Sequence, residues 1–170
     1  MNSHPFIPSD FNARWFLLSG GQTGADRAGL DAAIHLGLPY GGWCPGGRRA
    51  EDGKIPDVYQ LTETRSRGYL FRTEQNVIDS DATLIFTLGN LSGGSKRTLA
   101  FTKKHRKPCI HIGLSKTGAA AESVLRDFLA TLDFKRLNVA GSRESKEPGV
   151  GEWAFQLLVS VLGNSAPSRL

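Results

Sequence analysis

The chain has 170 residues, of which 39% are hydrophobic and 22% charged, so its length suits one domain with a single buried core. No apolar run approaches the roughly 18 residues of a membrane span, and the first residues lack the basic start and apolar core of a signal peptide. We therefore expect a cytoplasmic protein without a membrane role. Cys44 and Cys109 lie far apart, each at the end of an apolar segment, which argues against a disulfide framework or a cysteine-based metal site.

The formal net charge of +5 favours an anionic partner. Nucleic acid is one candidate, and the densest basic run is Lys-Lys-His-Arg-Lys at residues 103–107. This run ends a predicted helix, where cations complement the negative end of the helix dipole. No aromatic residues interleave with it, as a surface that stacks single-stranded bases would require. We therefore expect no nucleic-acid binding.

Hydrophobic periodicity predicts the helices of the fold. Apolar residues recur at helical spacing over residues 25–36, 121–132 and 150–161. Weaker patterns predict two shorter helices, over residues 70–78 and 98–105. The stretch of sequence between each predicted helix and the next is long enough to hold a strand.

Short apolar runs bounded by glycine or proline lie between these helices, as is typical of strands buried on both faces. The alternation predicts an α/β fold with a doubly wound, Rossmann-like, mostly parallel sheet and helices on both faces. We expect a single ligand-binding domain over residues 14–163, a loose segment over 1–13 and a tail over 164–170. The predicted strands are residues 15–18, 40–44, 82–87, 109–112 and 137–140.

The strongest local signal is Ser-Gly-Gly-Gln-Thr-Gly-Ala-Asp at residues 19–26, between a predicted strand and a predicted helix. Thr23 with Asp26 three residues later fits a capping box. The glycines allow a ligand close to the backbone amides at the positive end of the helix. The spacing matches neither the dinucleotide pattern G-x-G-x-x-G nor the P-loop G-x-x-x-x-G-K-[ST]. Alone, the segment fits a phosphate site and a plain capped turn equally well.

A second segment of this kind, Asn-Leu-Ser-Gly-Gly-Ser-Lys-Arg-Thr at residues 90–98, also follows a predicted strand. In a doubly wound sheet, we expect the first and third strands to flank the topological switch point, where diverging loops leave a crevice. Lys96 and Arg97 add positive charge to amides that already point toward an anion. Two such segments favour a phosphate site over two plain turns.

Other polar segments are candidates for the rest of the site. Gly-Ser-Arg-Glu at residues 141–144 follows the last predicted strand, and its Arg-Glu pair fits either contact with a ring system or a surface ion pair. Arg72 and Glu74 are two apart, about 200° around a helix, so we expect one of them to face the crevice or a neighbouring subunit. The long connection 45–67 carries paired arginines and paired carboxylates, which suit either ligand recognition or a solvated charge run.

Short motifs occur in order along residues 17–158. They are Gly-Gly-Gln-Thr-Gly-Ala-Asp at 20–26, Gly-Arg-Arg-Ala-Glu-Asp-Gly at 47–53, Arg-Thr-Glu at 72–74, Asn-Val at 76–77, Asp-Ser-Asp-Ala-Thr at 79–83, Gly-Gly at 93–94 and Asn-Val-Ala-Gly at 138–141. Together they resemble the molybdenum cofactor carrier protein family, within the Rossmann-like superfamily of lysine-decarboxylase-like phosphoribohydrolases. The resemblance implies a homo-oligomer, commonly a tetramer, that stores or delivers a molybdopterin-type cofactor without chemical turnover.

The resemblance also implies roles for individual residues. The first two glycine segments bind the cofactor phosphate, residues 141–144 border the pterin, and the pterin's dithiolene rather than the protein ligates the metal. The chain departs from the family pattern at Ser95 and Lys96, where Thr-Ala is usual, and at Ser142, where Pro is usual. The predicted cofactor-binding residues are Gly20, Gly21, Gln22, Thr23, Gly24, Arg72, Glu74, Gly93, Gly94, Ser95, Lys96, Arg97, Thr98, Gly141, Ser142, Arg143 and Glu144.

The hydrolase motif of that superfamily, P-G-G-x-G-T-x-x-E, is unmet, because Ala100 or Phe101 stands where its carboxylate would be. Without that acid, the reaction lacks an obvious general acid or base. We therefore predict a carrier with no catalytic residues, whose candidate protein partners are molybdoenzymes or cofactor-synthesis proteins. The alternative is a nucleotide-binding sensor, or a nucleotide-processing hydrolase with Glu74, Glu144 and Asp52 as its candidate acids.

Overall fold

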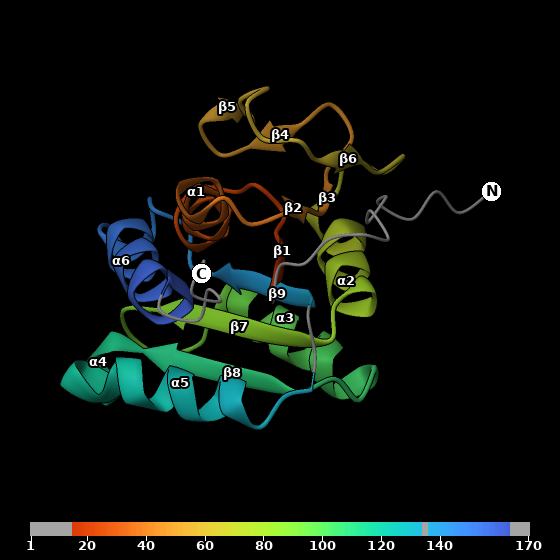
Figure 1. The fold of residues 1–170 in the computed structure, drawn as a ribbon. Helices are drawn as coiled ribbons and strands as arrows, with labels where there is room; N and C mark the ends of the chain where they lie inside the picture. Colours follow the sequence, from red (N-terminus) through yellow and green to blue (C-terminus); the bar gives the residue numbers. More distant parts are fainter. Residues whose placement is uncertain (1–14, 134–135, 164–170) are drawn as a thin grey trace.

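A five-stranded parallel sheet forms the centre of the computed structural model, which describes residues 15–133 and 136–163 (Figure 1). This arrangement confirms the predicted doubly wound α/β fold. The predicted end segments 1–13 and 164–170 lie outside the described residues. The strands, in chain order, are β1 (Phe16–Leu18), β2 (Tyr40–Gly41), β7 (Ala82–Thr87), β8 (Cys109–Gly113) and β9 (Arg136–Gly141).

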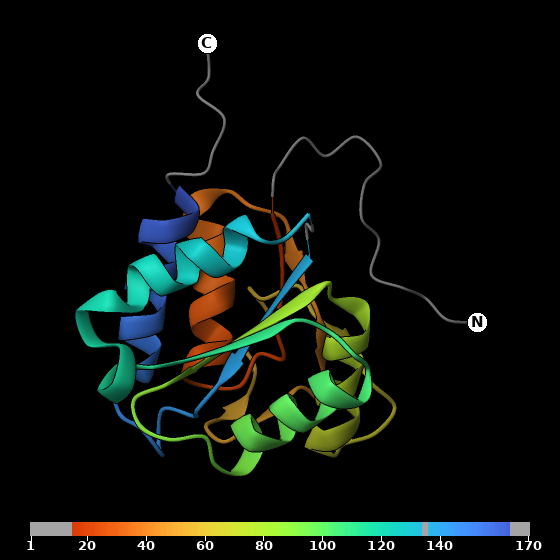
Figure 2. The same cartoon turned by 90° about the horizontal axis from the view of Figure 1, so that it is seen from below.

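Helices cover both faces of the sheet (Figure 2). The helices α1 (Ala25–Leu36), α5 (Ala121–Ala130) and α6 (Val150–Gly163) pack on one face, and α2 (Tyr69–Asp79) and α3 (Gly93–Lys104) pack on the other. A short helix α4 (Leu114–Thr117) and a single 3₁₀ turn η1 (Gly118–Ala120) precede α5. Within the described part of the chain, no helix has the length and apolar character needed to cross a bilayer.

The two faces of the sheet differ in polarity. Leu84, Phe86 and Val139 are buried in the main core with α1, α5 and α6. Because successive side chains of a strand point to opposite faces, the polar Thr83 and Asn138 point toward α2 and α3. The amide of Asn138 donates a hydrogen bond to Thr83 Oγ1 at 3.3 Å, so this face carries buried polar groups. The polar face is the one on which the site described below is built.

The last strand of the chain lies in the middle of the sheet. The strand order is β2-β1-β9-β7-β8, with β9 paired to β1 on one side and β7 on the other. If β9 and α6 are counted first, the order becomes the usual 3-2-1-4-5 of doubly wound sheets, and the switch point lies between β9 and β7. This corrects the expectation that the first and third strands flank the switch point, because β9 separates them.

The predicted strand 40–44 is two strands in the structure. Gly42 has φ of +129°, and a side chain here would come 2.2 Å from the carbonyl oxygen of Ser19. The chain turns at this glycine, so β2 stays in the main sheet while β3 (Trp43–Cys44) pairs with β6 (Thr62–Glu63). In the sequence, a hairpin of β4 (Arg49–Ala50) and β5 (Gly53–Lys54) falls between β3 and β6.

The long connection 45–67 is anchored to α1 and does not form a free loop. Asp52 accepts two hydrogen bonds from the guanidinium of Arg27, at 2.5 and 2.8 Å. The hydroxyl of Tyr59 donates to Asp31 at 2.8 Å, and Tyr59 packs in a small second core with Leu30. The connection therefore forms a layer over α1, on the side away from the sheet (Figure 1).

Helix α3 begins earlier than predicted, so the second glycine segment forms its first turn. The hydroxyl of Ser95 accepts a hydrogen bond from the amide of Ser92 at 3.0 Å and donates to its carbonyl at 2.8 Å. This exchange closes the first turn and offsets the low helix propensity of Gly93 and Gly94. The helix start therefore lies where the prediction placed a loop.

Candidate functional site

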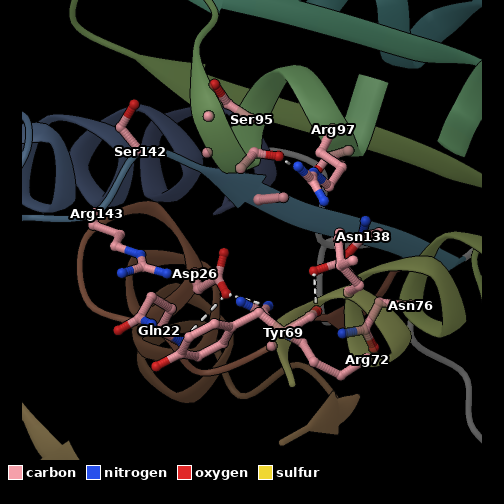
Figure 3. Close-up of a pocket in the computed structure, with 18 of the residues that line it drawn as sticks. Gln22, Asp26, Tyr69, Arg72, Asn76, Ser95, Arg97, Asn138, Ser142 and Arg143 are labelled. Carbon is pink, nitrogen blue, oxygen red and sulfur yellow. Dashed lines mark hydrogen bonds and ion pairs between the residues drawn. The ribbon is translucent and has the colours of Figure 1, made fainter. Parts of the chain in front are cut away.

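A cavity of about 870 Å³ lies between α2 and α3, against the carboxyl end of β9 (Figure 3). Both predicted glycine segments reach it. The predicted site residues that line it are Gly20, Gln22, Arg72, Gly93, Gly94, Ser95, Arg97, Thr98, Gly141, Ser142 and Arg143; those that do not are Gly21, Thr23, Gly24, Glu74, Lys96 and Glu144. The lining residues that sequence reasoning missed are Asp26, Ser66, Gly68, Tyr69, Leu70, Phe71, Thr73, Asn76, Ser92, Asn138, Val139, Ala140, Ser145 and Lys146.

The first turn of α3 carries concentrated positive charge. Among the described residues, the amides of Gly93 and Gly94 have no hydrogen-bond partner. Nζ of Lys146 lies 2.6 Å from Oγ of Ser92, directly at this helix start, and Arg97 lines the same wall. The start of a helix is the positive end of its dipole, so cations placed there are unfavourable. A bound anion would remove this repulsion. The arrangement therefore suits a phosphate.

The segment before α1 offers fewer free backbone amides for a phosphate than its glycines suggested. The amide of Gln22 donates to the carboxylate of Asp26 at 3.2 Å, and the amide of Thr23 donates to Oε1 of Gln22 at 3.1 Å. The amide of Ala25 donates to the carbonyl of Ser142 at 3.1 Å. These amides are engaged within the protein, so they are not free to hold a phosphate as the sequence reading expected.

The predicted capping box at Thr23 and Asp26 is wrong. Helix α1 begins after Gly24, and no side chain caps it. The hydroxyl of Thr23 instead hydrogen-bonds the carboxylate of Glu51 and accepts a bond from the amide of Glu144 at 3.3 Å. A distant carboxylate therefore competes successfully for the hydroxyl that the local pattern assigned to the helix.

The side chain of Gln22 presents an unpaired amide nitrogen at the cavity (Figure 3). Its side-chain oxygen accepts bonds from the backbone amides of Thr23 at 3.1 Å and Glu51 at 2.9 Å, which fixes its orientation. The residue is only 4% exposed, and its Nε2 has no partner among the described residues. A buried donor without a partner costs about 1–3 kcal/mol, so a ligand acceptor here would be favoured.

Of the pair on α2, Arg72 faces the cavity. Its guanidinium forms an ion pair with Asp26 at 2.8 Å, and both side chains are largely buried. Glu74 points elsewhere, accepting bonds from Lys104 at 2.6 Å and His105 at 2.7 Å on α3. Those bonds, from Lys104 first and then His105, hold the pKa of Glu74 below its usual value. The structure thus brings Arg72 to the site and pairs Glu74 outside it.

The ring of Tyr69 lies among arginines at the other end of the cavity (Figure 3). The guanidinium carbons of Arg143, Arg49 and Arg72 lie 4.8, 5.6 and 5.9 Å from its centroid. Such contacts are attractive because the ring face is electron-rich. This end of the cavity therefore joins an aromatic wall to positive charge, which suits a flat heterocycle with acceptor atoms at its edge.

Glu144 holds the start of α6 rather than facing the cavity. Its carboxylate accepts hydrogen bonds from the amides of Gly149 at 2.5 Å and Gly151 at 3.1 Å. A carboxylate at this position satisfies amides that the helix leaves free and complements the helix dipole. Glu144 therefore caps α6 and, among the described residues, forms no ion pair with Arg143, while Arg143 lines the cavity and remains a candidate for contact with a ring system.

Glu147 joins the two loops that flank the switch point. It follows β9, and its carboxylate accepts hydrogen bonds from the amides of Leu88 at 2.7 Å and Gly89 at 2.9 Å, which follow β7. Burial acts to raise the pKa of Glu147. The hydrogen bonds from the Ser142 hydroxyl and from the two amides outweigh burial, so the pKa lies below the usual 4.5.

This depressed pKa predicts an acid-dependent loss of stability. Because the folded pKa of Glu147 lies below the unfolded value, its contribution is present above pH 4.5 and is lost as the pH falls through the folded pKa. We expect Glu147→Gln to lower the free energy of unfolding by about 1–3 kcal/mol at neutral pH, and by progressively less in acid. Urea denaturation at a series of pH values measures this difference. A difference that stays constant across the series would contradict the assignment.

Arg48 and Glu51 of segment 47–53 make structural contacts, while Arg49 reaches the ring of Tyr69 at the cavity. The guanidinium of Arg48 donates to the backbone carbonyls of residues 55, 56 and 59. The carboxylate of Glu51 hydrogen-bonds Thr23 and Ser145, linking the loops that precede α1 and α6. These contacts of Arg48 and Glu51 lie within the protein, whereas Arg49 remains a candidate for ligand recognition.

The structure offers no cluster that resembles a metal site. Among residues 15–133 and 136–163, no group of three or more His, Cys, Asp or Glu side chains is placed to hold a metal ion. Cys44 and Cys109 are free thiols, and burial raises the pKa of each.

Comparison with known proteins places the chain in a family. The model of the circularly permutated YpsA SLOG family matches residues 17–162. The chain belongs to this family. A crystal structure from Syntrophus aciditrophicus, of a protein named "putative molybdenum carrier protein", is 44% identical, with a TM-score of 0.83 over 88% of this chain and 95% of that chain. These findings confirm the resemblance seen in the sequence, and the permutation agrees with the central place of β9. None of the curated proteins matches the sequence.

Proposed function

We propose that this chain is a cytoplasmic carrier that holds a molybdopterin-type cofactor, a phosphorylated pterin, for storage or delivery without chemical turnover. The observation that carries the proposal is one cavity with an open anion position at the start of α3 and an aromatic wall at its other end. The name of the 44% identical protein supports the choice of ligand. A molybdoenzyme or a cofactor-synthesis protein would exchange the cofactor with it.

The phosphate would occupy the first turn of α3. The amides of Gly93 and Gly94 supply hydrogen bonds, and Lys146 and Arg97 supply charge. Charge-assisted bonds to a phosphate are stronger than those between neutral groups. A dianionic monoester at this position would also relieve the repulsion between the cations and the helix dipole.

The pterin would occupy the end of the cavity near Tyr69. A pterin is flat, and ring nitrogens and a carbonyl line its edge. The unpaired Nε2 of Gln22 and the guanidinium of Arg143 are donors suited to that edge, and the ring of Tyr69 forms an apolar wall beside them. The metal would remain on the pterin's dithiolene, since no cluster of protein ligands is present in the described part of the chain.

The positions of the acidic groups support binding over turnover. Glu74 pairs with α3, Glu144 caps α6, and Asp52 pairs with Arg27, so all three candidate acids of the hydrolase alternative are engaged outside the cavity. Asp26 lines the cavity, but its carboxylate is bound to Arg72. A general acid or base needs a carboxylate that can reach the ligand and exchange a proton.

Retention of the cofactor tests the proposal. We expect Lys146→Ala and Arg97→Ala each to weaken binding of molybdopterin by roughly 10- to 100-fold, because each removes a charged contact worth about 1.5–3 kcal/mol. Equilibrium binding by fluorescence titration measures the affinity. The control is Lys54→Ala, which removes an exposed lysine that pairs with Asp57 away from the cavity. Equal affinity in all three variants would refute this placement of the phosphate.

A nucleotide-binding sensor is the second candidate, because the strand order matches that of nucleotide-binding folds and an aromatic wall also suits a purine. A panel of nucleotides titrated alongside molybdopterin separates the two. Tighter binding of a nucleotide, or release of base or phosphate, would favour a sensor or hydrolase.

Self-association is also part of the proposal. Leu70 and Phe71 are 48% and 56% exposed at the edge of the cavity, which suits contact with a second copy. Sedimentation equilibrium measures the oligomeric state.

A further inference from the structure

The carboxyl edge of the sheet has several positions that could take a phosphate, and the protein fills some of them with its own groups. Helices α1, α3 and α6 all begin at this edge, directly after β1, β7 and β9 or the loops that follow them. At α1, the amides of Gln22, Thr23 and Ala25 are bound by groups of the protein. The start of α6 and the end of β7 are each filled by a carboxylate, that of Glu144 and that of Glu147.

Helix α6 occupies the place that receives a dinucleotide in related folds. When β9 is counted as the first strand, α6 is the helix of the first strand-to-helix unit, whose start binds the pyrophosphate in dinucleotide-binding sheets. Here the carboxylate of Glu144 accepts bonds from the amides of Gly149 and Gly151. An internal anion thus stands where the pyrophosphate would bind.

The switch point is filled in the same way. Glu147 crosses from the loop after β9 to the amides of Leu88 and Gly89 after β7, at 2.7 and 2.9 Å. The crevice between these strands is the usual position for a bound dinucleotide. A second internal carboxylate therefore closes it and leaves negative charge beside Lys146.

We infer that this cavity selects ligands with a single phosphate monoester and rejects those with a pyrophosphate diester, and that Glu144 and Glu147 determine this specificity. The inference rests on the proposed function for the identity of the pterin. Beside Lys146 and Arg97, the amides of Gly93 and Gly94 line the cavity without a partner among the described residues, and they suit one phosphate. The first-turn amides of α2, Tyr69 and Leu70, are also unpaired within the described part of the chain, but they lie at the other end of the cavity, beside the ring of Tyr69. Glu144 and Glu147 lie beyond the cavity lining, toward the switch point. A second phosphate that extends from the cavity in that direction would meet their carboxylates, and like charges brought together in an interface are strongly unfavourable.

The test compares matched ligands that differ in the phosphate group. The full-length protein is titrated with molybdopterin and with the same pterin in dinucleotide form, where a pyrophosphate diester replaces the monoester. A second pair of probes, guanosine monophosphate and diguanosine pyrophosphate, keeps the base constant. Calorimetry gives the affinities, and amide NMR shifts of Gly93 and Gly94 report occupation of the α3 start. We expect the monoester of each pair to bind at least about tenfold tighter.

Two variants test the assigned residues independently. Glu147→Gln and Glu144→Gln keep side-chain size and remove a charge, and each is expected to narrow the monoester preference by about tenfold. Glu122→Gln is the matched control, because Glu122 lies on α5 and pairs with Arg126 there. Circular dichroism checks that each variant is folded, and either folded variant suffices for the comparison.

The outcomes separate the inference from the proposed function. If the dinucleotide pterin or diguanosine pyrophosphate binds as tightly as its monoester, or if both glutamine variants keep the full preference, the inference is overturned while the carrier function stands. If neither pterin is retained but guanosine monophosphate binds over its diester, the carrier proposal fails and the inference stands. If no monoester shifts the amides of Gly93 and Gly94, the open anion position does not exist and both are overturned.

Discussion

Replacing Asp26 by alanine is expected to lower the free energy of unfolding by about 3–5 kcal/mol, because it leaves the guanidinium of Arg72 buried without its counter-ion. The side chain of Arg72 is 11% exposed and that of Asp26 is 6% exposed. Their ion pair joins the guanidinium Nη1 to the carboxylate Oδ2 at 2.8 Å. The same carboxylate also accepts the backbone amide of Gln22, so that bond is lost as well. Urea denaturation followed by circular dichroism measures the change.

The matched control for this change is Asp52→Ala. Asp52 also pairs with an arginine, Arg27, but its side chain is 46% exposed, so water competes for the pair. We expect a loss of about 0–1 kcal/mol. The double variant Asp26→Leu with Arg72→Met should recover much of the stability, because a buried pair replaced by apolar groups leaves no stranded charge. Similar losses for the two alanine variants would contradict this account of the buried pair.

Gly141→Ala is expected to destabilise the protein by about 3 kcal/mol, because the added methyl has no room. A Cβ at this position would lie 2.0 Å from the carbonyl oxygen of Phe86 and 2.7 Å from Cβ of Ala25. To accept it, β9 must move away from β7, which also breaks the 3.0 Å bond from the amide of Ser142 to that carbonyl. Thermal unfolding measures the loss.

The same substitution at Gly94 is the control for Gly141. A Cβ at Gly94 meets nothing within 4 Å, and the residue lies in the first turn of a helix. Alanine there is expected to leave stability unchanged or raise it by about 0.5–1 kcal/mol. If Gly141→Ala unfolds at the same temperature as Gly94→Ala, then the close approach of β9 to β7 is not as tight as described.

Local patterns predicted the elements of the fold because burial sets those patterns directly. Residues 82–87 are apolar apart from Thr83 and Thr87, and β7 covers that range with every residue buried. The order of the strands was not predictable in this way. It depends on which strand pairs with β9, and the pairings of Leu137 with Leu17 and Ala82 link segments far apart in the chain.

The site was predicted only in part, because some of its residues have a local sequence signal and others do not. Glycines beside a helix start are visible in the sequence, and Gly93 and Gly94 indeed line the cavity. Tyr69 and Lys146 carried no such signal, because their importance comes from neighbours brought together by folding. The spacing of Arg72 and Glu74 on a helix could not show which of the two faces the cavity. In the fold, Asp26 on α1 pairs with Arg72 and holds it at the cavity. Lys104 at the end of α3 and the following His105 pair with Glu74 and hold it outside.

The central position of β9 has a consequence for how the protein is made. During synthesis on the ribosome, β1 and β7 emerge long before residues 136–141, which form the strand that joins them. Until then each has an unpaired edge, and exposed strand edges are prone to aggregation. Long-range pairings of this kind slow folding, because a large loop must close before they form. The nascent chain therefore depends on residues 136–141 to become a stable sheet, and chains that terminate before residue 136 cannot complete it.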